Sequence, residues 1–133
     1  MSTEHIVPLS KQALAVLAEL QPLTGSSELV FPNRSSLTRC MSENTLLSAM
    51  YRMGYHSKAT VHGFRATAST ILNEMGFDAD VIERQLAHAE RNKVRAAYHR
   101  SEYLEARRKM MQAWADYVDS LTTGAKIIPL RAH

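Results

Sequence analysis

Four polar residues have types and spacing that together suit a single reaction. His62 and Arg65 lie three positions apart in VHGFRAT, His88 follows in QLAHAE, and Tyr98 comes ten residues after His88 in RAAYHR. A tyrosine hydroxyl attacks a phosphodiester when neighbouring side chains activate the phenol and hold the phosphate. The set therefore indicates phosphoryl transfer through a phosphotyrosine ester, with cationic side chains in the place of a metal ion.

Each of the four residues fits one part of that reaction. Arg65 carries a planar guanidinium that binds two phosphate oxygens at once, and His62 can donate to the same phosphate or accept a proton. Tyr98 is the candidate nucleophile; its phenol is protonated at neutral pH and needs a nearby base or cation. His88 is a candidate phosphate ligand. Each residue taken singly is more often a capping, surface or core residue, so the hypothesis depends on the order and spacing of all four.

Helices are the elements that must position these residues, because apolar residues recur at helical spacing through most of the chain. We expect His62 and Arg65 on one face at the start of a helix, where free N–H groups and the helix dipole favour a phosphate. The opening HIVPLS is typical of a short β-strand that stops at Pro8. The expected helices cover about 10–20, 42–53, 62–75, 78–86, 94–98 and 101–121.

The composition bounds the class of protein. With 133 residues, 45% of them hydrophobic, the chain has the size and apolar content of one domain with a core. A net charge of +3 and a pI near 9.2 permit a nucleic-acid partner. Basic residues concentrate around Tyr98, between positions 91 and 109. They are Arg91, Lys93, Arg95, Arg100, Arg107, Arg108 and Lys109, and the first four are the candidate DNA contacts.

Cysteine usage and hydropathy exclude other classes. The single cysteine, Cys40, excludes an internal disulfide and is typical of a reducing cytoplasm. No apolar run approaches the roughly 20 residues of a membrane span, and the N-terminus lacks a signal-peptide pattern. We therefore expect a cytoplasmic protein with no membrane partner, no metal and no cofactor.

Three segments resemble the catalytic domain of the tyrosine recombinases, the phage integrase family. The family pattern is His-x-x-Arg, then Leu-Gly-His, then a tyrosine a short distance further along the chain. This chain has VHGFRATAST, QLAHAE and VRAAYHRSEYLEARRKMMQAWADYVD, with Ala87 where the family usually has glycine. The likeness is to the integrases of enterobacterial prophages and genomic islands, and it extends over nearly the whole chain from HIVPLS onward.

The resemblance implies a fold and an activity. The implied fold is mainly α: the helical C-terminal half of a tyrosine-recombinase catalytic domain, with a vestigial β-strand at the N-terminus. Residues 1–123 would form this portion and residues 124–133 a flexible tail. The implied activity is site-specific recombination and integration of double-stranded DNA at attachment sites, in a bacterial cytoplasm. The helix after Tyr98 resembles a segment that packs against a neighbouring protomer, so a homo-oligomer on DNA is expected.

The resemblance also implies residue roles. Tyr98 is the nucleophile, Arg65 the second active-site arginine, and His62 and His88 bind the phosphate and transfer protons. The family further uses an arginine in an Arg-x-x-Glu helix and a lysine on a β-hairpin, both before the stretch that resembles HIVPLS; Lys11 comes after it. We therefore expect the N-terminal half of the same enzyme as a partner, and no recombination by this chain alone.

Three alternatives stay open. A helical DNA-binding or accessory module without chemistry fits the basic stretch, but not the family register of the four residues. A type IB topoisomerase shares the tyrosine chemistry, whereas the short spacing from His88 to Tyr98 favours the integrase branch. A metal site would draw on the histidines, yet it has neither HExxH spacing nor a carboxylate to complete a tetrahedral set. Its candidate ligands are His56, His62, His88 and His99.

Overall fold

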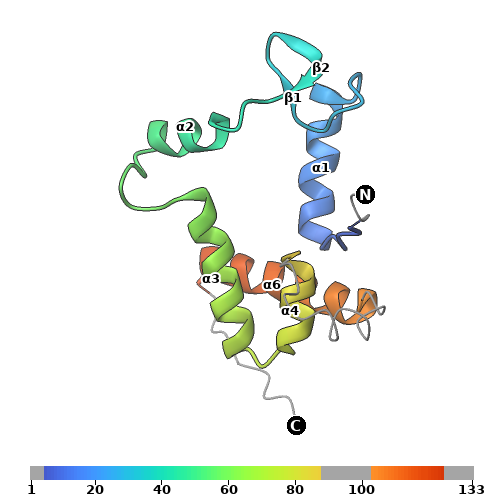
Figure 1. The fold of residues 1–133 in the computed structure, drawn as a ribbon, viewed down its shortest axis with the longest axis vertical. Coiled ribbons are helices and arrows are strands. Elements are labelled where there is room, and N and C mark those ends of the chain that lie inside the picture. The colour runs from blue at the N-terminus through green and yellow to red at the C-terminus, as the bar shows by residue number, and fades with distance from the viewer. Residues whose placement is uncertain (1–4, 88–102, 125–133) are drawn as a thin grey trace, which may run out of the picture. The chain divides into compact units, whose positions relative to one another are not determined.

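The structure, a computed structural model, describes residues 5–87 and 103–124 (Figure 1). These residues form five helices and one two-stranded antiparallel sheet, which confirms the expected mainly α fold. The expected helix at 94–98 and the tail after 124 lie outside the described residues. The elements are α1 (Lys11–Thr24), β1 (Pro32–Asn33), β2 (Ser36–Cys40), α2 (Thr45–Arg52), α3 (Val61–Glu74), α4 (Ala79–Gln85) and α6 (Leu104–Thr123).

The chain divides into two compact units. Unit 1 comprises Met1–Lys11 and Thr67–His133, and unit 2 comprises Gln12–Ala66. The boundary falls inside α3, so the first turns of that helix belong to unit 2 and the remainder to unit 1. The expected division into residues 1–123 and a tail over 124–133 stays a prediction.

Unit 1 has a hydrophobic core between α3, α4 and α6. Leu72, Val81, Ile82 and Met110 are buried there, the last two at 1% and 0% exposure. Asp78 starts α4 as its N-cap, because its side chain accepts a hydrogen bond from the backbone N–H of Asp80 at 2.7 Å. Residues packed around the core are Met75, Phe77, Leu86, Tyr103, Met111 and Trp114.

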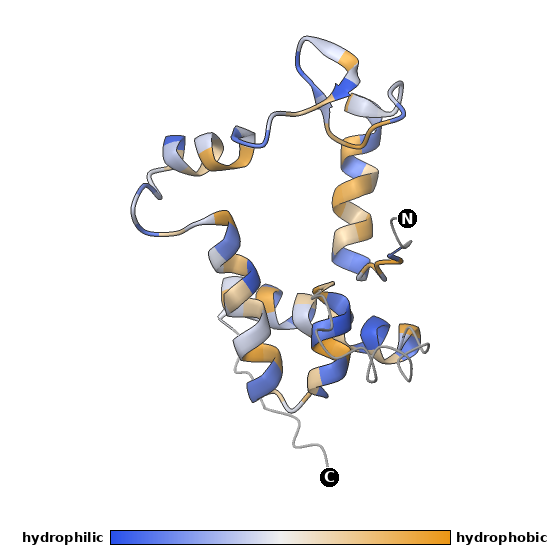
Figure 2. Ribbon diagram, viewed as in Figure 1, coloured by the Kyte–Doolittle hydropathy of each residue, from blue (hydrophilic) through white to orange (hydrophobic). Residues whose placement is uncertain are grey.

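Unit 2 is organised around a short hairpin and buries much less. Strand β1 pairs with β2 in antiparallel register, with Pro32 opposite Cys40 and Asn33 opposite Ser36. Within the described residues of unit 2, Met50 on α2 is the buried apolar side chain. Helix α1 buries no residue, although apolar residues recur along it (Figure 2). The apolar faces of unit 2 are therefore largely exposed.

The prediction of a β-strand in HIVPLS was wrong for residues 5–10, which form no strand; the strands lie within 32–40 instead. A β-strand requires a partner for its backbone groups. Here the carbonyl of Ile6 accepts a hydrogen bond from the Nη2 of Arg107 at 2.5 Å, and the backbone N–H of Lys11 donates to the Oε1 of Gln112 at 2.9 Å. Side chains of α6 thus take the place of a neighbouring strand.

Two further expectations differ from the structure. Helix α1 continues through Pro22 to Thr24, because a proline in the last turn removes only one intrahelical hydrogen bond. An apolar stripe at helical spacing usually faces a core, yet Leu46 and Tyr51 on α2 and Phe64 on α3 are 48%, 44% and 62% exposed. Periodicity identifies the apolar face of a helix, but it does not say whether another element covers that face.

Candidate active site

The N-terminus of α3 carries the two site residues that the structure describes. The Oγ1 of Thr60 accepts a hydrogen bond from the backbone N–H of Gly63 at 2.9 Å, which caps the helix. His62 and Arg65 lie three positions apart in the first turns and so project from the same face. His62 is exposed and Arg65 is half-buried. The expectation that these two residues share one face at a helix start is confirmed.

The start of α3 is suited to an anion. The first turn contains no acidic residue, so no carboxylate on the helix itself competes with a phosphate for the free N–H groups. A neutral or protonated imidazole at His62 and the guanidinium of Arg65 add hydrogen-bond donors on one side of that helix end. Helix end, histidine and arginine together can bind a phosphate and stabilise the charge that develops on it.

Gly63, between the two site residues, has a steric reason for its small size. A Cβ at this position would lie 3.1 Å from the Oγ1 of Thr60, closer than side-chain contacts normally approach. Any larger residue at position 63 would therefore press on the capping hydroxyl. A side chain at position 63 would require that hydroxyl to shift by a few tenths of an ångström.

The loop before α3 is held by local contacts. Gly54 and Ser57 both adopt positive φ angles, of 86° and 59°. The carbonyl of Tyr55 accepts hydrogen bonds from the backbone N–H groups of Lys58 and Ala59 at 3.0 and 3.3 Å. The ring of His56 lies 4.4 Å from that of Tyr51 between centroids. These contacts fix the path of the chain from α2 into the cap of α3.

The other proposed site residues lie outside the described residues. These are His88, Tyr98 and the four candidate DNA contacts, Arg91, Lys93, Arg95 and Arg100. The structure therefore brings together His62 and Arg65 alone among the expected set, and the roles of all four candidates stay predictions.

The turn that leads to His88 is described up to Ala87. Helix α4 ends at Gln85, and its C-cap Leu86 has φ −79° and ψ −1°. Ala87 then adopts φ +51°, and its N–H donates to the carbonyl of Arg84 at 3.2 Å. A left-handed residue after a helix end is most often glycine. This conformation gives a physical reason for the glycine that the family usually has at the position of Ala87.

The burial of Arg107 was not predicted from the sequence. Arg107 belongs to the basic stretch around Tyr98, yet its side chain is fully buried in unit 1, whereas its neighbour Arg108 is exposed and pairs with Glu105 at 2.9 Å. Arg107 therefore does not belong to a solvent-facing DNA contact surface. One sequence signal was present, because Arg107 lies in the middle of an apolar stripe at helical spacing. That stripe is Tyr103, Leu104, Met110, Met111 and Trp114.

The described part of the chain contains neither a cluster of metal ligands nor a membrane-spanning helix. Within residues 5–87 and within residues 103–124, or across both ranges, no three His, Cys, Asp or Glu side chains lie close enough together to bind a metal ion. Of the histidines considered for a metal site, His88 and His99 lie outside these ranges. None of the helices in these ranges is both long and apolar enough to cross a bilayer.

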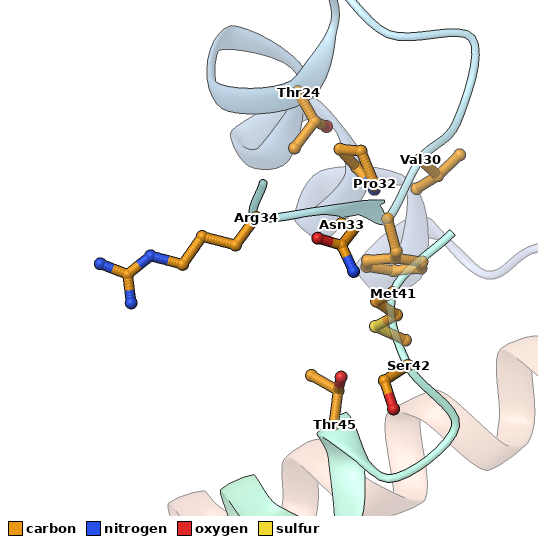
Figure 3. Close-up of a pocket in the computed structure, with 9 residues that line it drawn as sticks. Thr24, Val30, Pro32, Asn33, Arg34, Met41, Ser42 and Thr45 are labelled. Carbon is orange, nitrogen blue, oxygen red and sulfur yellow. The ribbon is translucent and has the colours of Figure 1, made fainter. Parts of the chain in front are cut away.

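A shallow pocket of about 310 Å³ lies in unit 2 between the hairpin and the ends of α1 and α2. Its one charged lining residue, Arg34, extends away from the other labelled side chains (Figure 3). The remaining lining residues are apolar or neutral, so no charged group converges on a ligand there. The lining residues are Thr24, Val30, Phe31, Pro32, Asn33, Arg34, Met41, Ser42 and Thr45.

Comparison with known proteins defines the class. Residues 1–105 match the phage integrase family. The chain belongs to this family of tyrosine recombinases, as its three motifs indicate. No solved structure gives a significant match.

Three relatives illustrate the similarity. The chain is 54% identical to the integrase of Enterobacteria phage P4 over 123 residues, which cover 90% of this chain and 28% of that protein. It is 47% identical to prophage integrase IntA of Escherichia coli K12 over 128 residues, or 96% of this chain and 31% of IntA. It is 43% identical to the integrase of Shigella phage Sf6 over 116 residues, or 86% of this chain and 30% of that protein. The chain thus spans less than a third of the length of these relatives.

Proposed function

We propose that this chain is the C-terminal portion of the catalytic domain of a tyrosine site-specific recombinase. In this proposal it takes part in breaking and rejoining double-stranded DNA at attachment sites. The observation that carries the proposal is the placement of His62 and Arg65 on one face at the capped N-terminus of α3, in a chain of the phage integrase family. Curated relatives that carry the name integrase support the same activity.

The chemistry assigns one step to each site residue. The Oη of Tyr98 attacks the phosphorus of a DNA phosphodiester, a phosphotyrosyl ester forms, and the deoxyribose hydroxyl leaves. Arg65 and the N-terminus of α3 hold the non-bridging oxygens, because charge accumulates there in the transition state. His62 and His88 donate to the same phosphate, accept the phenol proton and return a proton to the leaving oxygen. Attack by that hydroxyl on the ester reverses the step and rejoins the strand.

The partners follow from this chemistry. Double-stranded DNA is the substrate, and Arg91, Lys93, Arg95 and Arg100 are proposed to contact its phosphates. The N-terminal half of the same enzyme supplies the first active-site arginine and the hairpin lysine, for which this chain has no counterpart. We further propose that residues 1–123 form the catalytic portion, that 124–133 form a tail, and that the enzyme assembles as a homo-oligomer on DNA.

A chimera tests the proposal. This chain replaces the matching 123-residue segment of phage P4 integrase, which supplies the remaining length. The substrate is a nicked form of a DNA that phage P4 integrase itself cleaves, so that the covalent intermediate accumulates. We expect the chimera to form a covalent protein–DNA band on a denaturing gel, and the isolated 133-residue chain to form none.

Single substitutions in the chimera test the proposed roles of Tyr98 and Arg65. Tyr98→Phe should abolish the band, while Tyr103→Phe, a matched change five residues later, should leave it. Arg65→Ala should slow band formation by roughly a hundredfold or more, the effect of losing one transition-state donor. A band that persists in Tyr98→Phe contradicts the nucleophile assignment. A chimera that binds the DNA without forming a band supports a non-catalytic DNA-binding module instead.

A further inference from the structure

The guanidinium of Arg107 joins three parts of unit 1. Its Nε donates to the Oε1 of Gln85, the last residue of α4, at 2.8 Å. Its Nη2 donates to the backbone carbonyl of Ile6, in the segment before α1, at 2.5 Å. Arg107 itself lies on α6 and has 0% exposure. One side chain therefore connects α6 with the end of α4 and with the first described residues.

Burial of this cation restricts the positions of its partners. A guanidinium removed from water is costly unless its N–H groups find acceptors, so displacement of Gln85 or Ile6 would leave a buried donor unsatisfied. The two donors also point in different directions along a rigid plane, which fixes both acceptors at once. A lysine ammonium at this position would lack that planar fork. The guanidinium of Arg107 therefore fixes the positions of Gln85 and Ile6 relative to each other, in addition to bonding to each of them.

The end of α4 leads directly to a proposed active-site residue. Gln85 precedes His88 by three positions, and the two residues between them have defined backbone conformations. Leu86 is a right-handed C-cap, and Ala87 is left-handed at φ +51°. The contact that holds Gln85 therefore acts on a turn whose described backbone continues to Ala87. Ala87 is the residue before His88 in the sequence.

We propose that Arg107 is a positioning residue for the proposed active site, and that it acts through Gln85 on the segment that carries His88. The inference rests on the function proposed above for His88. It differs from the family chemistry, because Arg107 contacts neither substrate nor phosphate in this role. Misplacement of a catalytic group by about 1 Å can cost on the order of a hundredfold in rate, so loss of the contact should slow cleavage more than it weakens DNA binding.

Matched substitutions at Gln85 separate positioning from general stability. Gln85→Glu keeps an acceptor oxygen for the Nε of Arg107 at nearly the same size, whereas Gln85→Leu removes the acceptor. Arg107→Lys keeps the charge but lacks the fork. Leu72→Ala opens a cavity in the same core without touching either contact, and serves as the stability control.

The first measurement uses the phage P4 chimera under single turnover with saturating DNA, well below its unfolding midpoint. We expect Gln85→Leu and Arg107→Lys to slow covalent band formation by roughly ten- to a hundredfold, with DNA affinity changed less than about threefold. Gln85→Glu should stay within about twofold of the unsubstituted chimera, and so should Leu72→Ala despite its lower midpoint. A Gln85→Leu rate equal to the unsubstituted rate overturns the proposal, as does equal slowing by Leu72→Ala.

The second measurement uses the 133-residue chain and does not depend on activity. Ring proton and carbon resonances of His88 are compared by NMR with those of His62, which belongs to unit 2 and serves as the internal reference. Gln85→Leu should shift the His88 resonances and leave those of His62 in place, while Gln85→Glu should shift neither. Unchanged His88 resonances in Gln85→Leu overturn the positioning role.

The two measurements also separate this inference from the proposed function. A band that persists in Tyr98→Phe defeats the proposed function, whatever Gln85→Leu does. A band lost in Tyr98→Phe together with normal Gln85→Leu kinetics and resonances leaves the proposed function intact and defeats the role of Arg107.

Discussion

Unit 1 and unit 2 carry similar apolar helix patterns but bury very different amounts of them. In unit 1, Leu72, Val81, Ile82 and Met110 form a shared core of α3, α4 and α6. In the described residues of unit 2, Met50 is the buried apolar residue, and most of the exposed large apolar side chains belong to this unit. An amphipathic sequence therefore specifies which face of a helix is apolar, while the burial of that face depends on which other elements pack against it.

The largest expected difference between the units comes from two methionines. Met110→Ala, at 0% exposure in unit 1, should lower the free energy of unfolding by about 2–5 kcal/mol, because it leaves a cavity in the core. Met53→Ala, at 64% exposure in unit 2, should change it by less than about 0.5 kcal/mol. Urea unfolding of the chain, followed by circular dichroism, measures both. Equal losses would show that unit 2 has a core of comparable density in solution.

Two adjacent arginines on α6 differ in burial in the same way as the two units. Arg107→Met should destabilise the chain by about 2–3 kcal/mol, because the Oε1 of Gln85 and the carbonyl of Ile6 lose a buried charged donor. Arg108→Met removes an exposed ion pair with Glu105 and should cost less than about 0.5 kcal/mol. The single tryptophan, Trp114, packs against the core of unit 1, so its fluorescence during urea unfolding reports both changes. A stable Arg107→Met variant would show that the guanidinium is hydrated in solution.

Substitution of one phenylalanine in each unit should show a smaller difference in the free energy of unfolding. Phe77 packs against the core of unit 1, and Phe77→Ala should cost about 2 kcal/mol, less than a fully buried phenylalanine. Phe64 is 62% exposed in the part of α3 that belongs to unit 2, and Phe64→Ala should cost less than about 0.5 kcal/mol. Thermal unfolding midpoints rank the pair. A larger loss for Phe64→Ala would reverse the ranking and show that its ring is covered in solution.

The smallest expected effect is a gain in stability. Ala87→Gly should stabilise unit 1 by about 0.5 kcal/mol, because relief of the left-handed alanine exceeds the entropy gained by the unfolded chain. Ala113→Gly, inside α6, is the matched control and should destabilise by about 1 kcal/mol. Differences of this size require urea unfolding with both variants in parallel. A loss of stability in Ala87→Gly would mean that the methyl group makes contacts that outweigh the strain.

Local signals in the sequence predicted the helices well. Glycines follow α2, α3 and α6, and Asp78 opens α4 as an N-cap, so the boundaries of these elements depend on neighbouring residues alone. The strand expected in HIVPLS was wrong because its backbone partner is the side chain of Arg107, more than a hundred positions away. No local pattern encodes such a contact. The exposure of Leu46 and Phe64 has a similar origin, since burial is a property of packing between elements.

The candidate site also contains features that local spacing predicts and features that depend on distant contacts. His62 and Arg65 share a helix face because they lie three positions apart in one helix, so local spacing was enough to predict it. Arg107 was grouped with the other basic residues between positions 91 and 109, because charge is usually a surface signal. Its position within the apolar stripe from Tyr103 to Trp114 instead favours burial, and the structure shows that Arg107 is buried.

The contact between Arg107 and Ile6 has a consequence for the order of folding. The two residues are 101 positions apart, and unit 1 is made of two stretches of chain separated by the whole of unit 2. Closing so long a loop carries an entropic penalty that local helix formation does not. During synthesis, residues 5–11 emerge before α6, and they find their acceptor and donor partners only after α6 has left the ribosome. The segment before α1 can therefore join unit 1 only after α6 has formed.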